Sequence, residues 1–244
     1  LKPTYPAYHF NIGKALQQDG RIDEAVHEYS LALKLKPDYG EVHNSMGNIY
    51  INQGLIDKAI QEYKIASKLN PNDLIPHYNL GKVYHYKRGQ LEEGIKEYLT
   101  VLKIDPNFMD AHYNLGNAYL TQMRLYDAME EYKAALNLKP DHFSARNNLG
   151  LAYFNAGLIN EAIQEYLTAL RFDPNYADAH YNLGLAYNFM NLKDEARKEF
   201  ETVLKLKPDF VEAYNNLGTT YHIQGRLDEA IQASLAALKL KPDY

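Results

Sequence analysis

Apolar residues recur along the chain at the three- and four-residue spacing that places side chains on one face of a helix. Residues 109–142 contain two such stripes. The first stripe consists of His112, Leu115, Gly116 and Tyr119, and the second of Ala128, Tyr132, Ala135 and Leu136. Residues 122–124 separate them as a short turn. Pro140 ends the second helix, because proline lacks an N–H group and restricts the residue before it. The segment is predicted to be an antiparallel helix hairpin.

The same pattern fills the whole chain. Terminating prolines lie 34 residues apart, with one interval of 35, at Pro37, Pro71, Pro106, Pro140, Pro174, Pro208 and Pro242. Seven repeats are therefore predicted, at 6–39, 40–73, 74–108, 109–142, 143–176, 177–210 and 211–244, with residues 1–5 as the tail of a preceding repeat. One hairpin cannot bury its own stripe, so neighbouring copies must cover it. We expect a single solenoid domain over residues 1–244.

Two further positions are repeated in register. The glycine at 116 is matched by Gly13, Gly47, Gly81, Gly150, Gly184 and Gly218, and the aromatic at 132 by Tyr29, Tyr63, Tyr98, Tyr166 and Phe200, with Ser234 as the departure. Period, glycine, aromatic and proline together resemble the tetratricopeptide repeat family along the whole array. The resemblance implies an all-α, right-handed superhelix that binds other proteins without catalysis. The family's usual tryptophan near the start of the first helix is replaced here, mostly by histidine.

Composition narrows the possible functions. The net charge of −5 comes without a run of Lys or Arg, which argues against nucleic-acid binding. Apolar runs are short and interrupted, so we expect no membrane insertion. The chain has no cysteine, which excludes disulfides and thiolate metal sites and leaves the compartment open.

Candidate chemistry is sparse. Five histidines recur in register (His9, His43, His77, His112 and His180), but each is at least one repeat away from the next, so we interpret them as packing residues. Glu28, Glu62, Glu97, Glu131, Glu165 and Glu199 also recur, and we interpret them as a solvated face. The chain has no cysteine nucleophile and no Gly-x-Ser-x-Gly motif, and its glycines do not form a phosphate-binding loop. We expect no catalytic residue, no metal and no cofactor.

One face of the first helix in each repeat is not needed for packing the hairpins. It carries asparagine at six equivalent positions, Asn11, Asn79, Asn114, Asn148, Asn182 and Asn216, with Ser45 in the second repeat. An amide offers donors and an acceptor that complement a peptide unit. The row resembles the asparagine ladder in the repeat arm of O-N-acetylglucosamine transferases, which implies backbone recognition of an extended peptide. The alternative is that these asparagines bond neighbouring helices.

The residues around this row predict the character of the ligand. They are Tyr78, Lys82, Tyr113, Asn117, Leu120, Leu151, Phe154, Tyr181, Leu185 and Phe189. A contiguous apolar surface of this kind is typical of a partner site. Acidic Asp110 and Asp178 lie along one edge. We expect an extended or helical, moderately hydrophobic segment of a partner protein, basic toward that edge. The position of Tyr113 never holds lysine, so the carboxylate clamp of some tetratricopeptide domains is rejected.

Two other functions stay open. No additional polar helix follows the last helix to cover Leu235 and Leu238. We therefore expect this end of the array to contact either a second copy or a continuation of the chain. The array is also compatible with the substrate-recruiting arm of a larger enzyme, such as a glycosyltransferase. The third repeat has one extra residue within 86–89 and Gly94 in place of alanine, which predicts a weak point or bend, with harmless loop variation as the simpler alternative.

Overall fold

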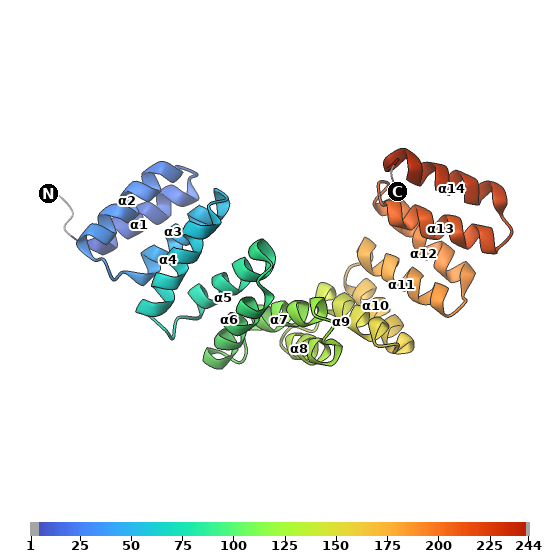
Figure 1. The fold of residues 1–244 in the computed structure, drawn as a ribbon, viewed down its shortest axis with the longest axis horizontal. Coiled ribbons are helices and arrows are strands. Elements are labelled where there is room, and N and C mark those ends of the chain that lie inside the picture. The colour runs from blue at the N-terminus through green and yellow to red at the C-terminus, as the bar shows by residue number, and fades with distance from the viewer. Residues whose placement is uncertain (1–4, 243–244) are drawn as a thin grey trace. The chain divides into compact units, whose positions relative to one another are not determined.

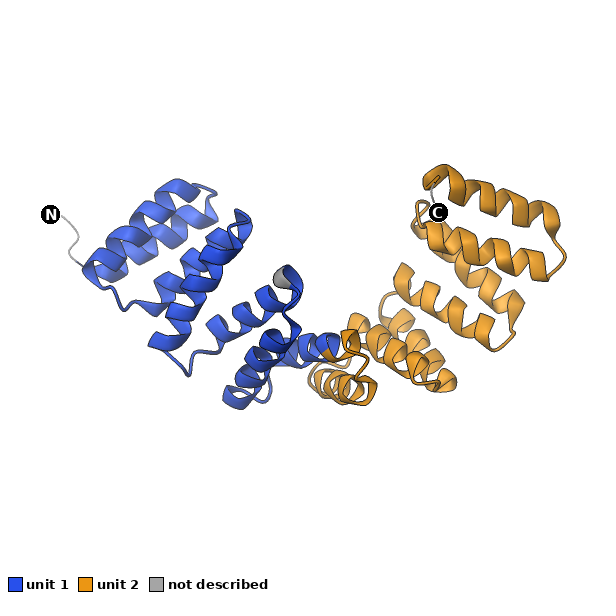
Figure 2. Ribbon diagram, in the orientation of Figure 1, with its two compact units in different colours: residues 1–118 blue, residues 119–244 orange. Residues whose placement is uncertain are grey.

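The computed structural model describes residues 5–242, and these fold almost wholly into helices (Figure 1). Their contacts divide into two compact units, residues 1–118 and 119–244 (Figure 2), each described here by itself. The first unit holds α1 (Pro6–Gln18), α2 (Ile22–Leu35), α3 (Gly40–Asn52), α4 (Ile56–Leu69), α5 (Leu74–Lys82), the π-helix η1 (Val83–Arg88) and α6 (Leu91–Ile104). The boundary falls within α7 (Met109–Thr121). The second unit holds α8 (Leu125–Leu138), α9 (Phe143–Asn155), α10 (Ile159–Phe172), α11 (Ala177–Phe189), α12 (Lys193–Leu206), α13 (Val211–Ile223) and α14 (Leu227–Leu240).

The predicted all-α array of helix hairpins is confirmed. The first helix of every repeat, called helix A below, begins at the residue predicted to open that repeat, from Pro6 in α1 to Val211 in α13. The second helix, called helix B, follows after a short turn. Over the described residues no helix has the length and apolar character needed to cross a membrane. That the array folds as a single domain stays a prediction.

The turn between helices A and B follows one design. In the first repeat Asp19-Gly20-Arg21 joins α1 to α2, and the N–H of Arg21 donates to the carbonyl of Leu16 at 2.9 Å. The middle residue has a positive φ, which glycine adopts without strain. Gly20, Gly54, Gly157 and Gly225 hold this place, but Met123 and Asn191 hold it in the fourth and sixth repeats with φ of 58° and 61°.

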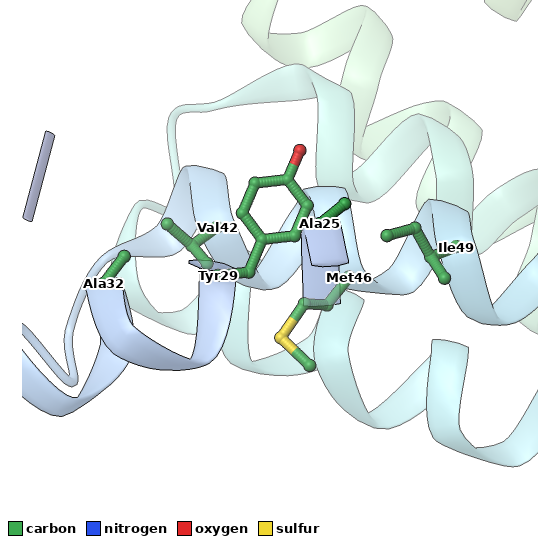
Figure 3. Close-up of a cluster of buried hydrophobic side chains, with 6 residues drawn as sticks. All are labelled: Ala25, Tyr29, Ala32, Val42, Met46 and Ile49. Atoms are coloured by element: carbon green, nitrogen blue, oxygen red, sulfur yellow. The ribbon is translucent and has the colours of Figure 1, made fainter. Parts of the chain in front are cut away.

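The core is built from the repeated small and aromatic residues. Tyr29 on α2 is fully buried among Ala25, Ala32 and the α3 residues Val42, Met46 and Ile49 (Figure 3). Helix B of one repeat therefore packs on helix A of the next, as a solenoid requires. Within a hairpin, the ring of helix B covers the glycine of helix A. A Cβ on Gly47 would meet the Tyr63 ring at 2.5 Å, so this contact admits only glycine.

The extra residue of the third repeat lies in a helix. The simpler alternative, variation in a loop, is therefore wrong. The end of helix A widens into the π-helix η1, a form that occurs mostly as single-turn bulges in α-helices and often at functional sites. Gly94 on α6 packs against this widened turn. A Cβ there would lie 3.1 Å from the Gly81 carbonyl oxygen and 3.3 Å from His85, so the alanine of other repeats would be crowded. Gly94 is thus the residue that makes room for the turn widened by the insertion.

The recurring glutamates do not form a free solvated face, and that interpretation is wrong. Nδ1 of His43 on α3 lies 2.6 Å from Oε2 of Glu62 on α4, and His9, His77 and His180 pair with Glu28, Glu97 and Glu199 in the same way. In the fifth repeat Arg146 takes the histidine's place and donates to Glu165 at 3.1 Å. These part-buried pairs join helix A to helix B inside five of the seven hairpins.

Candidate functional site

The asparagines of the predicted ladder lie on helix A, and four of the six bond the helix A before them. In the first unit the Nδ2 atom of Asn79 on α5 donates to Oδ1 of Asn44 on α3 at 3.0 Å. The Nδ2 atom of Asn114 on α7 donates to the Tyr78 hydroxyl, also at 3.0 Å. Both acceptors occupy the residue position just before the ladder position of their own repeat, which is Ser45 for Asn44 and Asn79 for Tyr78.

The second unit repeats the arrangement. Nδ2 of Asn182 on α11 donates to Oδ1 of Asn147 on α9 at 2.9 Å. Nδ2 of Asn216 on α13 donates to the Tyr181 hydroxyl at 3.0 Å. Tyrosine and asparagine interchange at the acceptor position because each offers an oxygen there. The row of asparagines is thus a seam of hydrogen bonds between successive A helices.

This seam favours the alternative interpretation for the amide N–H groups, since they already bond neighbouring helices. The side-chain Oδ1 atoms of Asn79, Asn182 and Asn216 accept no hydrogen bond from the described residues. Asn114 is only 7% exposed, and its Oδ1 atom already accepts a hydrogen bond from the Tyr86 hydroxyl. It is therefore the ladder asparagine with the least hydrogen-bonding capacity left for a bound peptide. Asn11 is exposed. Recognition of a peptide by this row stays a prediction, and it depends on the unused carbonyl oxygens.

Asn148 and Tyr86 extend the network. Asn148 accepts from Nδ2 of Asn147 at 3.1 Å. The hydroxyl of Tyr86, on η1, also accepts a hydrogen bond from Nδ2 of Asn117 at 3.2 Å. Burial, reinforced by the charge of Asp110, raises the pKa of Tyr78 to about 12, so its hydroxyl stays protonated in this network.

A pocket of about 430 Å³ opens on the first unit where α3 faces α5 and η1. Three asparagines line it, Asn48, Asn52 and Asn79, together with Lys82 and Lys87. Ile51, Val83, Tyr63 and Tyr86 supply its apolar walls. No acidic residue is among its lining residues. Among these residues, Asn79 and Lys82 belong to the peptide-binding residues predicted from the sequence.

The second unit has an apolar strip in place of this pocket. It consists of Leu151 and Phe154 on α9 with Leu185 and Phe189 on α11, all predicted site residues. The rings of Phe154 and Phe189 meet edge to face, with centroids 6.0 Å apart. Phe189 is 69% exposed, and the other three are half-buried. Leu185 takes the helical position that Lys82 takes in the third repeat, so the two units present different chemistry at equivalent positions.

The remaining predicted residues are less open. Tyr113 and Leu120 on α7 are half-buried, and so is Tyr181, whose ring packs against Phe210 with centroids 5.0 Å apart. Asp178, on the predicted acidic edge, is paired with Lys207 at 2.8 Å. That pairing weakens the expectation of a basic ligand at this edge.

Sequence reasoning missed the acceptors of the seam, Asn44 and Asn147, and the pocket residues Asn48, Asn52 and Lys87. The signal was present for the first pair, because the residue before each ladder asparagine carries an oxygen in six of the seven repeats. The pocket could not be found in this way, since Lys87 belongs to the one repeat that breaks the period. Among the described residues no group of three or more His, Asp or Glu is placed to hold a metal ion.

Stacked helix hairpins that leave amides, lysines and phenylalanines on open faces define an α-solenoid scaffold for protein–protein interaction. The model for "TPR repeat" matches residues 18–54, 47–85, 85–122, 124–157 and 153–188, and that for "Tetratricopeptide repeat" matches 181–244. The chain belongs to the tetratricopeptide repeat family, whose members bind protein or peptide partners.

Solved structures agree with this assignment. A crystal structure of MamA is 32% identical, covers 67% of this chain and 95% of its own, and has a TM-score of 0.62. YrrB, described as a TPR protein with an unusual peptide-binding site, is 22% identical, covers 75% and 93%, and has a TM-score of 0.61. A tetratricopeptide repeat protein from Parabacteroides merdae ATCC 43184 is 17% identical, covers 97% and 93%, and scores 0.74. The last two likenesses show the fold alone. No curated protein matches the chain.

Proposed function

We propose that this chain is a noncatalytic scaffold that binds an extended segment of a partner protein on the open faces of its A helices. The observation that carries the proposal is the exposed Phe189 beside Phe154 on the second unit. Neither the seam nor the buried core accounts for an aromatic side chain left in water at this place. Exposed aromatic and aliphatic side chains gathered on one face are typical of a partner surface.

The energetics favour a guest that covers this strip. Complete burial of one large apolar side chain contributes about 1.5–3 kcal/mol. The helices beneath the strip are held by the Asn182–Asn147 bond of the seam, so little order must be created on binding. The free carbonyl oxygens of Asn182 and Asn216 accept N–H groups of the guest backbone, which gives the ladder asparagines a part in binding.

The test is selection of random sixteen-residue peptides displayed on phage against the folded chain, followed by affinity measurement with synthetic copies. Phe189→Ala should weaken the selected peptides about tenfold, the equivalent of roughly 1.4 kcal/mol. Tyr126→Ala is the matched control, because Tyr126 is an exposed aromatic on α8, a B helix. Circular dichroism verifies that both variants fold. Equal affinity of Phe189→Ala and the unchanged chain would refute the strip as the binding surface.

A second candidate function is self-association, and the outer face of α14 favours it. Leu227, Ile231, Leu235 and Leu238 are all exposed there. Their counterparts on α2 include Ile22, Val26 and Leu33, which pack against the cluster formed with α3. The face of α14 therefore has the apolar pattern that elsewhere accepts a following A helix. We propose that a second copy of the chain can cover it.

Sedimentation velocity over a hundredfold range of concentration tests this candidate. The sedimentation coefficient should rise with concentration and stop rising in the variant Ile231→Lys, Leu235→Lys. The same double substitution must leave the helical content unchanged. A coefficient independent of concentration in the unchanged chain would exclude self-association in that range.

A further inference from the structure

Two lysines on the wall of the first unit's pocket have no acidic partner. Lys82 on α5 and Lys87 on η1 make no ion pair with any described residue. The ammonium of Lys82 lies 5.3 Å above the Tyr78 ring, which supports its position without neutralising it. Some basic side chains pair with acids, as in the Lys207–Asp178 and Arg146–Glu165 pairs, whereas Lys82 and Lys87 both line a pocket that has no acidic lining residue. In a chain of net charge −5, this pocket is a local concentration of positive charge.

The amide groups of the pocket add donors. Oδ1 of Asn48 already accepts from the Tyr63 hydroxyl at 2.7 Å and from Nδ2 of Asn79 at 3.4 Å. These two bonds fix the orientation of the Asn48 amide, so its Nδ2 atom is left as a donor. Asn52 on the same helix has no hydrogen-bond partner among the described residues. The unused groups of the pocket thus favour a ligand rich in acceptors and negative charge.

The walls of the pocket set the second requirement. Val83 is buried and Ile51 half-buried, and the ring of Tyr86 is 51% exposed at the rim. A volume of about 430 Å³ exceeds what one carboxyl group fills, and it lies within the range of specific ligand pockets, about 300–1,000 Å³. An acidic side chain together with an adjacent aliphatic side chain matches both the charge and the apolar surface.

We propose that this pocket binds an aspartate or glutamate side chain of the partner's extended segment, flanked by an aliphatic residue. This inference rests on the proposed function and adds the ligand chemistry of the first unit. The arrangement differs from the carboxylate clamp rejected above, since Asn44 stands where the clamp would have lysine and both lysines come from the third repeat. The π-helix supplies Val83, Tyr86 and Lys87 together, so the inserted residue builds much of the site.

The phage-selected peptides also test this inference. Peptides selected by the unchanged chain should share an acidic residue next to an aliphatic one. Changing that residue to Asn or Gln should weaken binding about three- to tenfold, which is the effect of one or two partly exposed ion pairs. The same change should have no effect on binding to the double variant Lys82→Gln, Lys87→Gln. Raising the salt concentration should reduce the difference.

The control variant Lys14→Gln, Lys34→Gln removes the same charge outside the pocket, with Lys14 at the position in α1 that Lys82 has in α5. It should bind like the unchanged chain. Selected peptides without a shared acid, or an equal loss on Glu→Gln in the unchanged chain and in the Lys82, Lys87 variant, would overturn the inference and leave the proposed function standing. Failure to select any peptide would overturn both.

Discussion

His43 and Glu62 are bonded through Nδ1 and Oε2 at 2.6 Å, and Nε2 of the same ring lies 3.1 Å from the Pro37 carbonyl oxygen. One side chain therefore ties α3 both to its own helix B and to the proline that ends the preceding repeat. His180 repeats the arrangement with Glu199 and Pro174. In the fifth repeat Arg146 contacts Glu165 and Pro140 in the same way, with a permanent charge.

The histidine bonds predict a pH-dependent stability. The hydrogen bond to Glu62 is the main cause that raises the pKa of His43 above its ordinary value of 6.5. Burial opposes the charge of His180, but the bonds to Glu199 and Pro174 outweigh it and its pKa is also raised. A raised pKa in the folded state means that this stabilisation is complete below pH 6.5. It is lost as the pH rises through the folded-state pKa.

His43→Arg with His180→Arg should flatten this dependence, because arginine keeps both contacts and does not titrate. Urea unfolding between pH 5.5 and 8.5 measures the slope, and NMR titration of the ring protons measures the histidine pKa values. A slope unchanged in the double variant would show that the pairs do not cause it.

Alanine at the hairpin glycines should have opposite effects in different repeats. A Cβ on Gly47 would lie 2.5 Å from the Tyr63 ring, whereas on Gly218 the nearest atom is the small Oγ of Ser234 at 3.2 Å. We expect Gly47→Ala to cost about 1–3 kcal/mol through overpacking. Gly218→Ala should be neutral or stabilising by up to about 1 kcal/mol through helix propensity. Chemical denaturation measures both, and equal effects would contradict the packing argument.

Glycine should stabilise the two turns that lack it. Met123 and Asn191 hold positive φ values, which cost a residue with a Cβ about 1–2 kcal/mol, and asparagine less. Met123→Gly should therefore raise the free energy of unfolding by about 1 kcal/mol, and Asn191→Gly by a smaller amount. Gly157→Ala is the reverse control, with φ of 78° and open space around its Cβ. The turn argument fails if Gly157→Ala does not destabilise the chain.

Two buried tyrosines should respond differently to removal of the hydroxyl group. Tyr63 donates to Asn48, but the Tyr98 hydroxyl is buried without a partner among the described residues, because Lys82 stands where the Asn48 acceptor would be. Tyr63→Phe should cost about 0.5–1.5 kcal/mol. Tyr98→Phe should be neutral or stabilising, since it removes an unsatisfied polar group. A loss for Tyr98→Phe equal to that for Tyr63→Phe would mean that its hydroxyl has a partner.

The seam predicts a structural cost for asparagine substitutions. Asn182→Ala removes the 2.9 Å bond to Asn147 and should lower stability by about 0.5–1.5 kcal/mol. Asn11→Ala should have no effect, because Asn11 is exposed and has no partner among the described residues. Thermal unfolding compares the two. If both variants melt like the unchanged chain, the seam contributes nothing to stability, and a loss of peptide affinity on Asn182→Ala then reports binding directly.

The sequence alone determined the all-α class, the start of each A helix, and the recurrence of a glycine on helix A and, in six of the seven repeats, of an aromatic on helix B. These follow from local periodicity, which depends only on residues three or four apart. The tertiary structure decided which polar groups are already used. His43 reaches a glutamate 19 residues away, and Asn79 reaches an asparagine 35 residues away. Nothing in the helical period distinguishes an amide that bonds the neighbouring helix from one that faces water.

The third repeat is a second case in which the sequence pattern does not predict the contacts between helices. The sequence located the extra residue, but only the backbone shows that the insertion widens helix A into η1 and brings Lys87 beside Lys82. A helix accepts such an insertion because a π-turn keeps the backbone hydrogen bonds that a loop would expose to water. The repeat pattern therefore specified the scaffold, and the packing of one irregular turn created the pocket.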